Sequence, residues 1–128
     1  ISEGELYEGS IWESLLFIKH HNLHNIKIIL DQNDLIILGK TKNCLKLDPI
    51  ETKLKGFGFD VFQINGHNYK EIVPALKFLK KDDKKNKIVL AKTIKGNSIK
   101  FMENKPEWHY WQNLSLMNEK ELLKELKK

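Results

Sequence analysis

Apolar residues along the chain alternate between helical spacing and short β-branched runs. Helical spacing, in which apolar residues recur every three to four positions, predicts helices over residues 8–22, 49–56, 69–81 and 117–128. Short runs rich in isoleucine and valine predict strands over residues 25–30, 59–64 and 87–93. Polar or glycine-containing turns follow these strands, so the chain reads as strands alternating with helices.

Three stretches fit the pattern less well. Residues 35–38 form a brief apolar run that Gly39 closes. Pro74 falls within the helical pattern of residues 69–81 and is predicted to mark a first turn or a kink. Residues 95–113 show no clear period.

Strands that alternate with helices predict an α/β fold, with a mostly parallel sheet covered by helices on both faces. Ligands of such sheets bind at the carboxyl ends of the strands. The segments predicted to lie there are residues 2–5, 31–35, 65–67 and the loop after Thr93. All four are polar or rich in glycine.

Composition narrows the class of protein. The 128 residues suffice for one domain with a modest core, and no apolar run reaches the roughly 20 residues that a membrane-spanning helix needs. The single cysteine, Cys44, fits a reducing, cytoplasmic setting. The net charge of +5 comes largely from lysines, including the run at residues 80–87. Asp82 and Asp83 interrupt that run and no aromatic residues interleave with it, which favours a solvated loop over a nucleic-acid surface.

Two strand-end segments carry candidate chemistry. Glu3 lies beside Gly4 just before a predicted helix, a combination that suits a cation and a nearby anion. Asn33 lies in the turn after the next strand, 30 positions later, and amide oxygens are good magnesium ligands. Taken singly, the first segment fits an acidic helix N-terminus and the second an ordinary turn. Together they predict one divalent-cation site at adjacent strand ends.

Three long segments resemble the transketolase family and cover nearly the whole chain. They read SEGELYEGSIWESLLFIKHHNLHNIKIILDQNDLIILGKT, FGFDVFQINGHNY and AKTIKGNSIKFMENKPEWH. The resemblance implies a thiamine-diphosphate-binding fold that is incomplete at its N-terminus, with residues 1–113 as a partial domain and 114–128 as a helical tail. It also implies thiamine diphosphate as cofactor, with Mg²⁺, or Ca²⁺ or Mn²⁺ in its place.

The resemblance assigns cofactor and metal contacts residue by residue. Glu3 and Asn33 match the metal-binding side chains, and the main-chain oxygen of Leu35 matches the third protein ligand. Ser2 and Gly4 match the turn that approaches the diphosphate. Further matches are Ile37 to an apolar residue against the thiazolium ring, and His109 to a histidine near the diphosphate and the reacting carbon.

Glu8 and Glu13 match acidic residues at a subunit interface that couple two active sites in the family. As alternatives, these two glutamates are exposed helix acids, and His109 is a loop histidine between Trp108 and Trp111. His67 follows a tight turn and, in the plainest interpretation, caps the next helix.

The sequence departs from the family pattern at three places. Ser2-Glu3 replaces the usual Gly-Asp, Tyr110 replaces a glycine after His109, and Asn97-Ser98 replaces a Lys-Gly or Tyr-Gly pair. Glutamate is one methylene longer than aspartate, and Mg²⁺ tolerates little error in ligand distance. We expect the ion to bind still, because the charge is kept and Asn33 is intact.

The resemblance implies transfer of a two-carbon ketol unit from a ketose phosphate to an aldose phosphate, as in the pentose phosphate pathway. The pyrimidine-binding half of the cofactor site would come from another domain or from the C-terminal subunit of a split transketolase, in a homodimer or heterotetramer. Alternatives are a deoxyxylulose-phosphate synthase, a transketolase for an unusual sugar, and a non-catalytic remnant. No nucleic-acid or membrane partner is expected.

Overall fold

A parallel sheet forms the centre of the molecule in the computed structural model, which describes residues 1–109 and 123–124. The strands are β1 (Lys27–Gln32), β4 (Asp60–Asn65) and β5 (Lys87–Lys92), arranged in the order β1-β5-β4. Both neighbouring pairs are parallel, and Lys27 and Asp60 lie opposite Lys87 in the register. The carboxyl ends of all three strands therefore meet at one edge.

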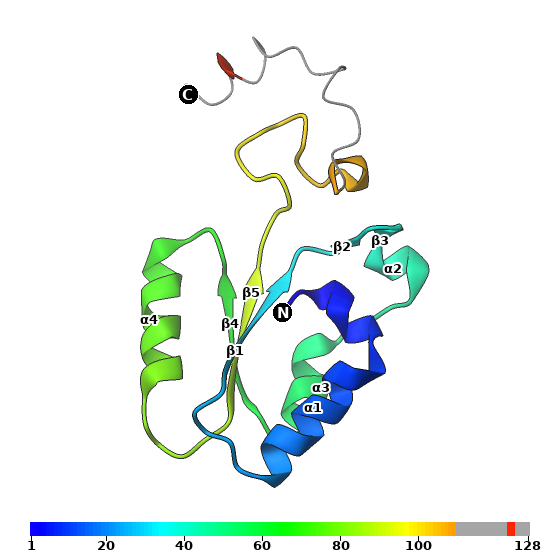
Figure 1. The fold of residues 1–128 in the computed structure, drawn as a ribbon. Helices are drawn as coiled ribbons and strands as arrows, with labels where there is room; N and C mark the ends of the chain where they lie inside the picture. The colour runs from blue at the N-terminus through cyan, green and yellow to red at the C-terminus, as the bar shows by residue number, and fades with distance from the viewer. Residues whose placement is uncertain (110–122, 125–128) are drawn as a thin grey trace.

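Helices cover both faces of this sheet, as Figure 1 shows. Helices α1 (Gly9–His20) and α3 (Ile50–Gly56) lie on one face, and α4 (Tyr69–Lys80) lies on the other. Alternate strand residues supply the two cores. Leu30, Ile88 and Leu90 face the first pair of helices, whereas Ile64, Val89 and Ala91 pack with α4. The α/β fold with helices on both faces is thus confirmed.

The first two residues extend the sheet beside β1. The amino group of Ile1 donates to the carbonyl oxygen of Ile29 at 3.0 Å, and the N–H of Asp31 donates to the carbonyl oxygen of Ile1 at 2.9 Å. Ser2 forms a parallel bridge with Asp31. A 3₁₀ helix, η1 (Glu3–Tyr7), follows directly and packs against β1. Residue 3 therefore lies at the same edge as the end of β1.

The end of β1 differs from the prediction. The strand runs through Asp31 and Gln32, which we expected in a turn, and it begins at Lys27. Both polar residues stay extended because each has a backbone partner: Asp31 bonds to Ile1, and the carbonyl oxygen of Gln32 accepts from the N–H of Thr93 at 2.9 Å.

The apolar run at residues 35–38 forms the first strand and the turn of a short hairpin. Strand β2 (Leu35–Ile36) pairs antiparallel with β3 (Gly39–Lys40), and the short helix α2 (Thr41–Cys44) follows. Gly39 has φ +131°, a conformation that side-chain-bearing residues rarely adopt, so it permits the reversal.

The ends of the other helices and strands lie within one or two residues of the predicted ends. The predicted position of Pro74 is a separate case. This proline lies inside α4 rather than in its first turn, while Asn68 caps the helix by accepting from the N–H of Lys70. Residues 95–109 form turns and the 3₁₀ helix η2 (Pro106–Trp108). The helix predicted over 117–128, and the tail at 114–128, lie outside the described residues except for 123–124, which are helical. In the described part of the chain, no helix has the length and apolar character to cross a membrane.

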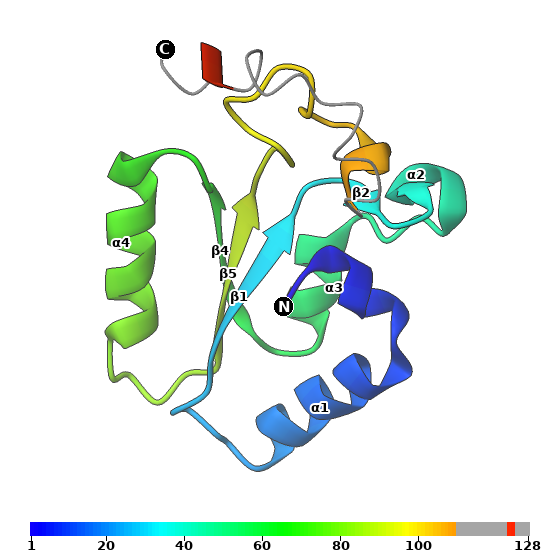
Figure 2. The same cartoon turned by 45° about the horizontal axis from the view of Figure 1, so that its top comes forward.

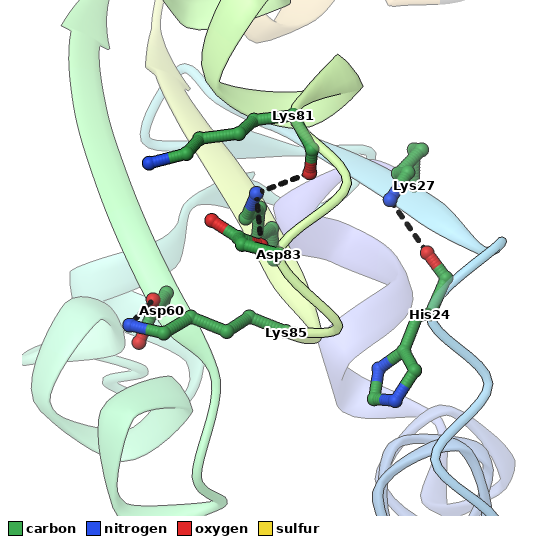
Figure 3. Close-up of polar contacts among 7 residues, drawn as sticks. His24, Lys27, Asp60, Lys81, Asp83 and Lys85 are labelled. Atoms are coloured by element: carbon green, nitrogen blue, oxygen red, sulfur yellow. Dashed lines mark hydrogen bonds and ion pairs between the residues drawn. The ribbon is translucent and has the colours of Figure 1, made fainter.

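The lysine run at residues 80–87 ends in a buried ion pair at the opposite edge of the sheet. The side chain of Lys87 is fully buried, and its Nζ lies 2.6 Å from Oδ1 of Asp83 and 2.7 Å from the carbonyl oxygen of Lys81 (Figure 3). The ammonium lowers the pKa of the Asp83 carboxyl. Lys85 and Asp60 form a second pair at 3.0 Å that is open to solvent. A wholly solvated loop was therefore the wrong prediction for Lys87.

We expect Asp83→Ala to destabilise the protein more than Lys85→Ala, because the first leaves a buried ammonium without its carboxylate. Lys85→Ala removes only an exposed pair and serves as the control. Because the folded-state pKa of Asp83 is depressed, its stabilisation is present above the unfolded pKa and is lost as the pH falls through the folded value. Urea unfolding at neutral and acidic pH measures both effects, and equal losses for the two variants at neutral pH would contradict the prediction.

Candidate cofactor site

The candidate site lies at the carboxyl edge of the sheet, where η1, the end of β1 and the β2–β3 hairpin come together (Figure 2). Glu3 is the first residue of η1 and is 1% exposed, among the most buried side chains of the molecule. Around its carboxylate lie the backbone of Asp34, the hydroxyl of Thr41 and the charge of Asp48. Asp34 directly follows Asn33, so the chain brings the two predicted ligand segments together.

The carboxylate of Glu3 is buried without a well-formed hydrogen bond. Neither oxygen has a hydrogen bond of normal geometry among the described residues, although the Asp34 backbone and the Thr41 hydroxyl approach closely enough to oppose the pKa rise. Burial is the largest effect and, with the charges of Asp34 and Asp48, raises the pKa of Glu3 to about 7. An unpaired buried carboxylate is costly in a protein and is stabilised by a bound cation.

Asn33 is oriented by two hydrogen bonds within the β1–β2 loop. Its Oδ1 accepts from the N–H of Leu35 at 3.1 Å, and its Nδ2 donates to Oδ2 of Asp31 at 3.4 Å. These bonds distinguish the amide oxygen from the nitrogen and leave Oδ1 a second lone pair. Asp34, between Asn33 and Leu35, has φ +60°, a left-handed conformation that aspartate tolerates better than most residues.

The donors fit a hard divalent cation. A carboxylate, an amide oxygen and a main-chain carbonyl are the oxygen ligands that such ions prefer. No group of three or more His, Cys, Asp or Glu side chains arranged for a metal occurs among residues 1–109 and 123–124. The predicted ligands are one carboxylate (Glu3), one amide oxygen (Asn33) and one main-chain oxygen (Leu35). A cluster of three His, Cys, Asp or Glu side chains is therefore not required for this site. The orphaned carboxylate of Glu3 is the structural feature that this set explains.

Ser2, which stands where the family pattern has glycine, is held by hydrogen bonds to Glu5. Glu5 accepts hydrogen bonds from the N–H of Ser2 at 2.6 Å and from its hydroxyl at 3.1 Å, and these bonds lower the pKa of Glu5. The Glu5 side chain therefore caps the start of η1 by accepting from the Ser2 N–H, and the Ser2 hydroxyl is engaged by the same carboxylate. A Cβ on Gly4 would lie 3.2 Å from Cγ2 of Ile36, so glycine permits the close packing of η1 against the hairpin.

The four remaining predicted site residues are exposed to solvent. Ile37 is 47% exposed in the β2–β3 turn. His109 is exposed after η2, and its N–H donates to the carbonyl oxygen of Pro106 at 2.8 Å. Glu8 and Glu13 are exposed at the start of α1 and within it. The roles expected for these four residues stay predictions.

His67 is not a helix cap, since Asn68 has that role. Its Nε2 instead accepts a hydrogen bond from the N–H of Ile94 at 2.7 Å, which ties the loop after β4 to the loop after β5. His67 and Thr93 line an open pocket on this edge together with Asn65, Lys92 and Asn97.

Sequence reasoning missed the polar residues that support the predicted donors. Thr93 donates its hydroxyl proton to Oδ1 of Asp31 across 62 positions of sequence. Gln32 is buried, and its Nε2 donates to Oδ1 of Asp48 at 3.3 Å. The sequence offered one indication of such support: Asp31 lies two residues before Asn33 at a strand end, where its carboxylate can reach the amide.

Similar proteins are known for nearly the whole chain. Residues 1–115 match the family model described as transketolase, thiamine diphosphate binding domain. The chain is 39% identical over 108 residues to an apulose-4-phosphate transketolase subunit of Actinobacillus succinogenes. It is 37% identical over 119 residues to the 6-deoxy-6-sulfo-D-fructose transketolase subunit of a Clostridium species.

The solved structures place the same fold in a longer protein. Transketolase from Campylobacter jejuni superposes with a TM-score of 0.78 at 30% identity, over 84% of this chain and 17% of that one. The matches to the Actinobacillus and Clostridium proteins cover 84% and 93% of this chain, and 39% and 42% of those proteins. The chain therefore spans about two fifths of the length of these two relatives.

The raised pKa of Glu3 leads to a prediction for the metal-free protein. Because the folded-state pKa lies above the unfolded value, ionising Glu3 destabilises the fold progressively as the pH rises from about 4.5 to 7. We expect Glu3→Gln to remove this dependence and to raise the free energy of unfolding at pH 8 by roughly 3 kcal/mol, from about 1.4 kcal/mol per pKa unit.

Chemical denaturation in the presence of a chelator measures this effect. Glu5→Gln is the control, because Glu5 is exposed and its pKa is lowered rather than raised. A pH profile of Glu3→Gln that parallels the wild-type profile would show that Glu3 is not a strained buried acid.

Proposed function

Since this chain belongs to the thiamine diphosphate-binding domain family of transketolases, we propose that it holds the metal ion and diphosphate in a transketolase-type enzyme. The observation that supports this most directly is the buried, unpartnered carboxylate of Glu3 beside the loop that carries Asn33. A fold without a cation to bind gains nothing from such a group, which destabilises it at neutral pH.

Within the proposed site, Glu3, Asn33 and the main-chain oxygen of Leu35 hold Mg²⁺, and Ca²⁺ or Mn²⁺ can take its place. The turn at Ser2 and Gly4 would approach the diphosphate, and Ile37 would contact the thiazolium ring. Thiamine diphosphate, when bound, supplies the carbanion-stabilising chemistry that breaks and forms carbon–carbon bonds. The residues of this chain bind and orient, which lowers the barrier by fixing geometry.

The departure from Gly-Asp to Ser2-Glu3 is compatible with this role. The Ser2 hydroxyl is held by Glu5 and so is not left unpaired at the cofactor turn. Glu3 remains buried despite its extra methylene, with Asp34 and Thr41 close to its carboxylate. A bound divalent cation favours the ionised carboxylate and lowers the pKa of Glu3.

We further propose that the chain works with a second protein part that binds the aminopyrimidine ring, either another domain or a separate C-terminal subunit. Two of the similar proteins are themselves named as transketolase subunits. The exposure of Glu8 and Glu13 on α1 is compatible with a subunit interface in a homodimer or heterotetramer. His109 would face the reacting carbon there.

The proposed reaction is the transfer of a two-carbon ketol unit from a ketose phosphate to an aldose phosphate. The similar subunits are named for apulose 4-phosphate and for 6-deoxy-6-sulfo-D-fructose, which supports an unusual sugar as substrate; the pentose phosphate pathway is the alternative setting. The chain's only cysteine, Cys44, is exposed and unpaired, which supports a reducing cytoplasm.

Asn33→Ala is expected to weaken Mg²⁺-dependent binding of thiamine diphosphate by at least about tenfold, because it removes one oxygen donor. Isothermal titration of the complete protein with thiamine diphosphate, with and without Mg²⁺, measures the effect. Asn43→Ala is the matched control, since Asn43 is an exposed asparagine of α2. Equal affinities for both variants and the wild type would contradict the assignment of Asn33.

Transfer activity is expected only when the protein containing this chain is combined with the part that binds the pyrimidine ring. A coupled assay with ketose phosphate donors and aldose phosphate acceptors, run on each component and on the mixture, measures this. Activity of a component that contains this chain but lacks the pyrimidine-binding part would contradict the half-site proposal. Cofactor binding without activity in the mixture, across a broad sugar panel, would favour a non-catalytic protein.

A further inference from the structure

A hydroxyl on the loop after β5 contacts the carboxylate that holds the predicted metal ligand Asn33. Oγ1 of Thr93 donates to Oδ1 of Asp31, and the other oxygen of Asp31 accepts from Nδ2 of Asn33 at 3.4 Å. All three side chains are partly buried. A chain of hydrogen bonds therefore runs from the end of β5, through the end of β1, to the proposed metal site.

The backbone fixes the position of Thr93 independently of its hydroxyl. Its N–H donates to the carbonyl oxygen of Gln32 at 2.9 Å, which anchors it to β1. On its other side, the N–H of Gly66 donates to the carbonyl oxygen of Lys92 at 2.7 Å. A Cβ at Gly66 would lie 2.6 Å from Cγ2 of Thr93, so only glycine lets the β4 loop approach this closely. Thr93 is thus held on two sides by neighbouring strand ends.

The carboxylate of Asp31 can only accept hydrogen bonds when ionised, so it attracts the NH₂ group of Asn33 and not its oxygen. The N–H of Leu35 donates to the Asn33 oxygen from the other side. The amide thereby has a defined orientation, with Oδ1 kept as an acceptor. Without Asp31, only the N–H of Leu35 opposes rotation of the amide by 180°, a rotation that would present a donor to the cation.

We propose that Asp31 and Thr93 are positioning residues that fix the amide orientation of Asn33 and thereby set the affinity for the metal–diphosphate unit. This inference rests on the proposed function. Neither residue touches the ion. Thr93 holds the carboxylate of Asp31, and Asp31 holds the amide of Asn33.

Thr93→Val and Thr93→Ser separate this role from packing. Valine keeps the methyl group near Gly66 but loses the hydroxyl, whereas serine keeps the hydroxyl and loses the methyl. We expect Thr93→Val to raise the dissociation constant for Mg²⁺, measured at fixed thiamine diphosphate in the complete protein, by about 10-fold. Thr93→Ser should remain close to wild type. The reverse order, with serine weak and valine normal, would show a packing role and overturn the proposal.

A second measurement does not need the cofactor. In protein labelled with ¹⁵N-asparagine, the Asn33 side-chain NH₂ signals can be assigned by their loss in Asn33→Ala. We expect these signals to shift and broaden in Thr93→Val and Asp31→Asn, and to stay at their wild-type positions in Thr93→Ser. Unchanged Asn33 signals in both Thr93→Val and Asp31→Asn would overturn the positioning role.

The two readouts distinguish this inference from the proposed function. If the wild-type protein binds neither Mg²⁺ nor thiamine diphosphate, the proposed function fails, while the NMR signals still decide whether Thr93 and Asp31 orient Asn33. If the wild type binds both and Thr93→Val binds them equally well, the proposed function stands and the positioning inference fails.

Discussion

The parallel register of the central sheet is the constraint on which the candidate site depends. Ser2 lies opposite Asp31, Asp31 lies opposite Ala91, and Ala91 lies opposite Ile64. Parallel pairing places the ends of all these segments at one edge, so residues far apart in sequence meet there. A slip of one residue would turn Asp31 toward the opposite face of the sheet and separate it from Thr93.

The carboxylates at that edge differ in whether they have hydrogen-bond partners. Glu3 is buried and unpartnered, whereas Asp31 and Glu5 are satisfied by hydrogen bonds from neighbouring residues. Protein interiors usually pair their carboxylates, so one left unpaired among paired neighbours marks where a positive charge is expected. The surrounding bonds occupy the carboxylates of Asp31 and Glu5, whereas Glu3 is buried and open to a cation.

Much of this arrangement followed from the sequence. The alternation of helical and strand-like apolar spacing predicted the α/β class. The rule that ligands bind at the carboxyl ends of parallel strands predicted that the Glu3 and Asn33 segments lie together. The end of β1 was misplaced because Asp31 and Gln32 are polar, and local patterns cannot see the backbone partners that keep them extended. The burial of Lys87 was missed for a similar reason: a run of charges predicts solvent, and only the fold places Asp83 against it. Bonds such as Thr93 to Asp31 depend on register, which no local pattern encodes.

In the proposed site, the near-neutral pKa of Glu3 would couple binding of the cation to release of a proton. With a pKa of about 7, the carboxyl of the metal-free protein is largely protonated at acidic pH, and a cation bound to Glu3 would displace that proton. The heat of loading in that range would then contain the ionisation enthalpy of whichever buffer accepts the proton. A carboxyl that titrates in the ordinary acidic range would show no such buffer dependence near neutrality. If Glu3 holds the cation as proposed, the extent of its burial would set how strongly cofactor occupancy responds to acidification.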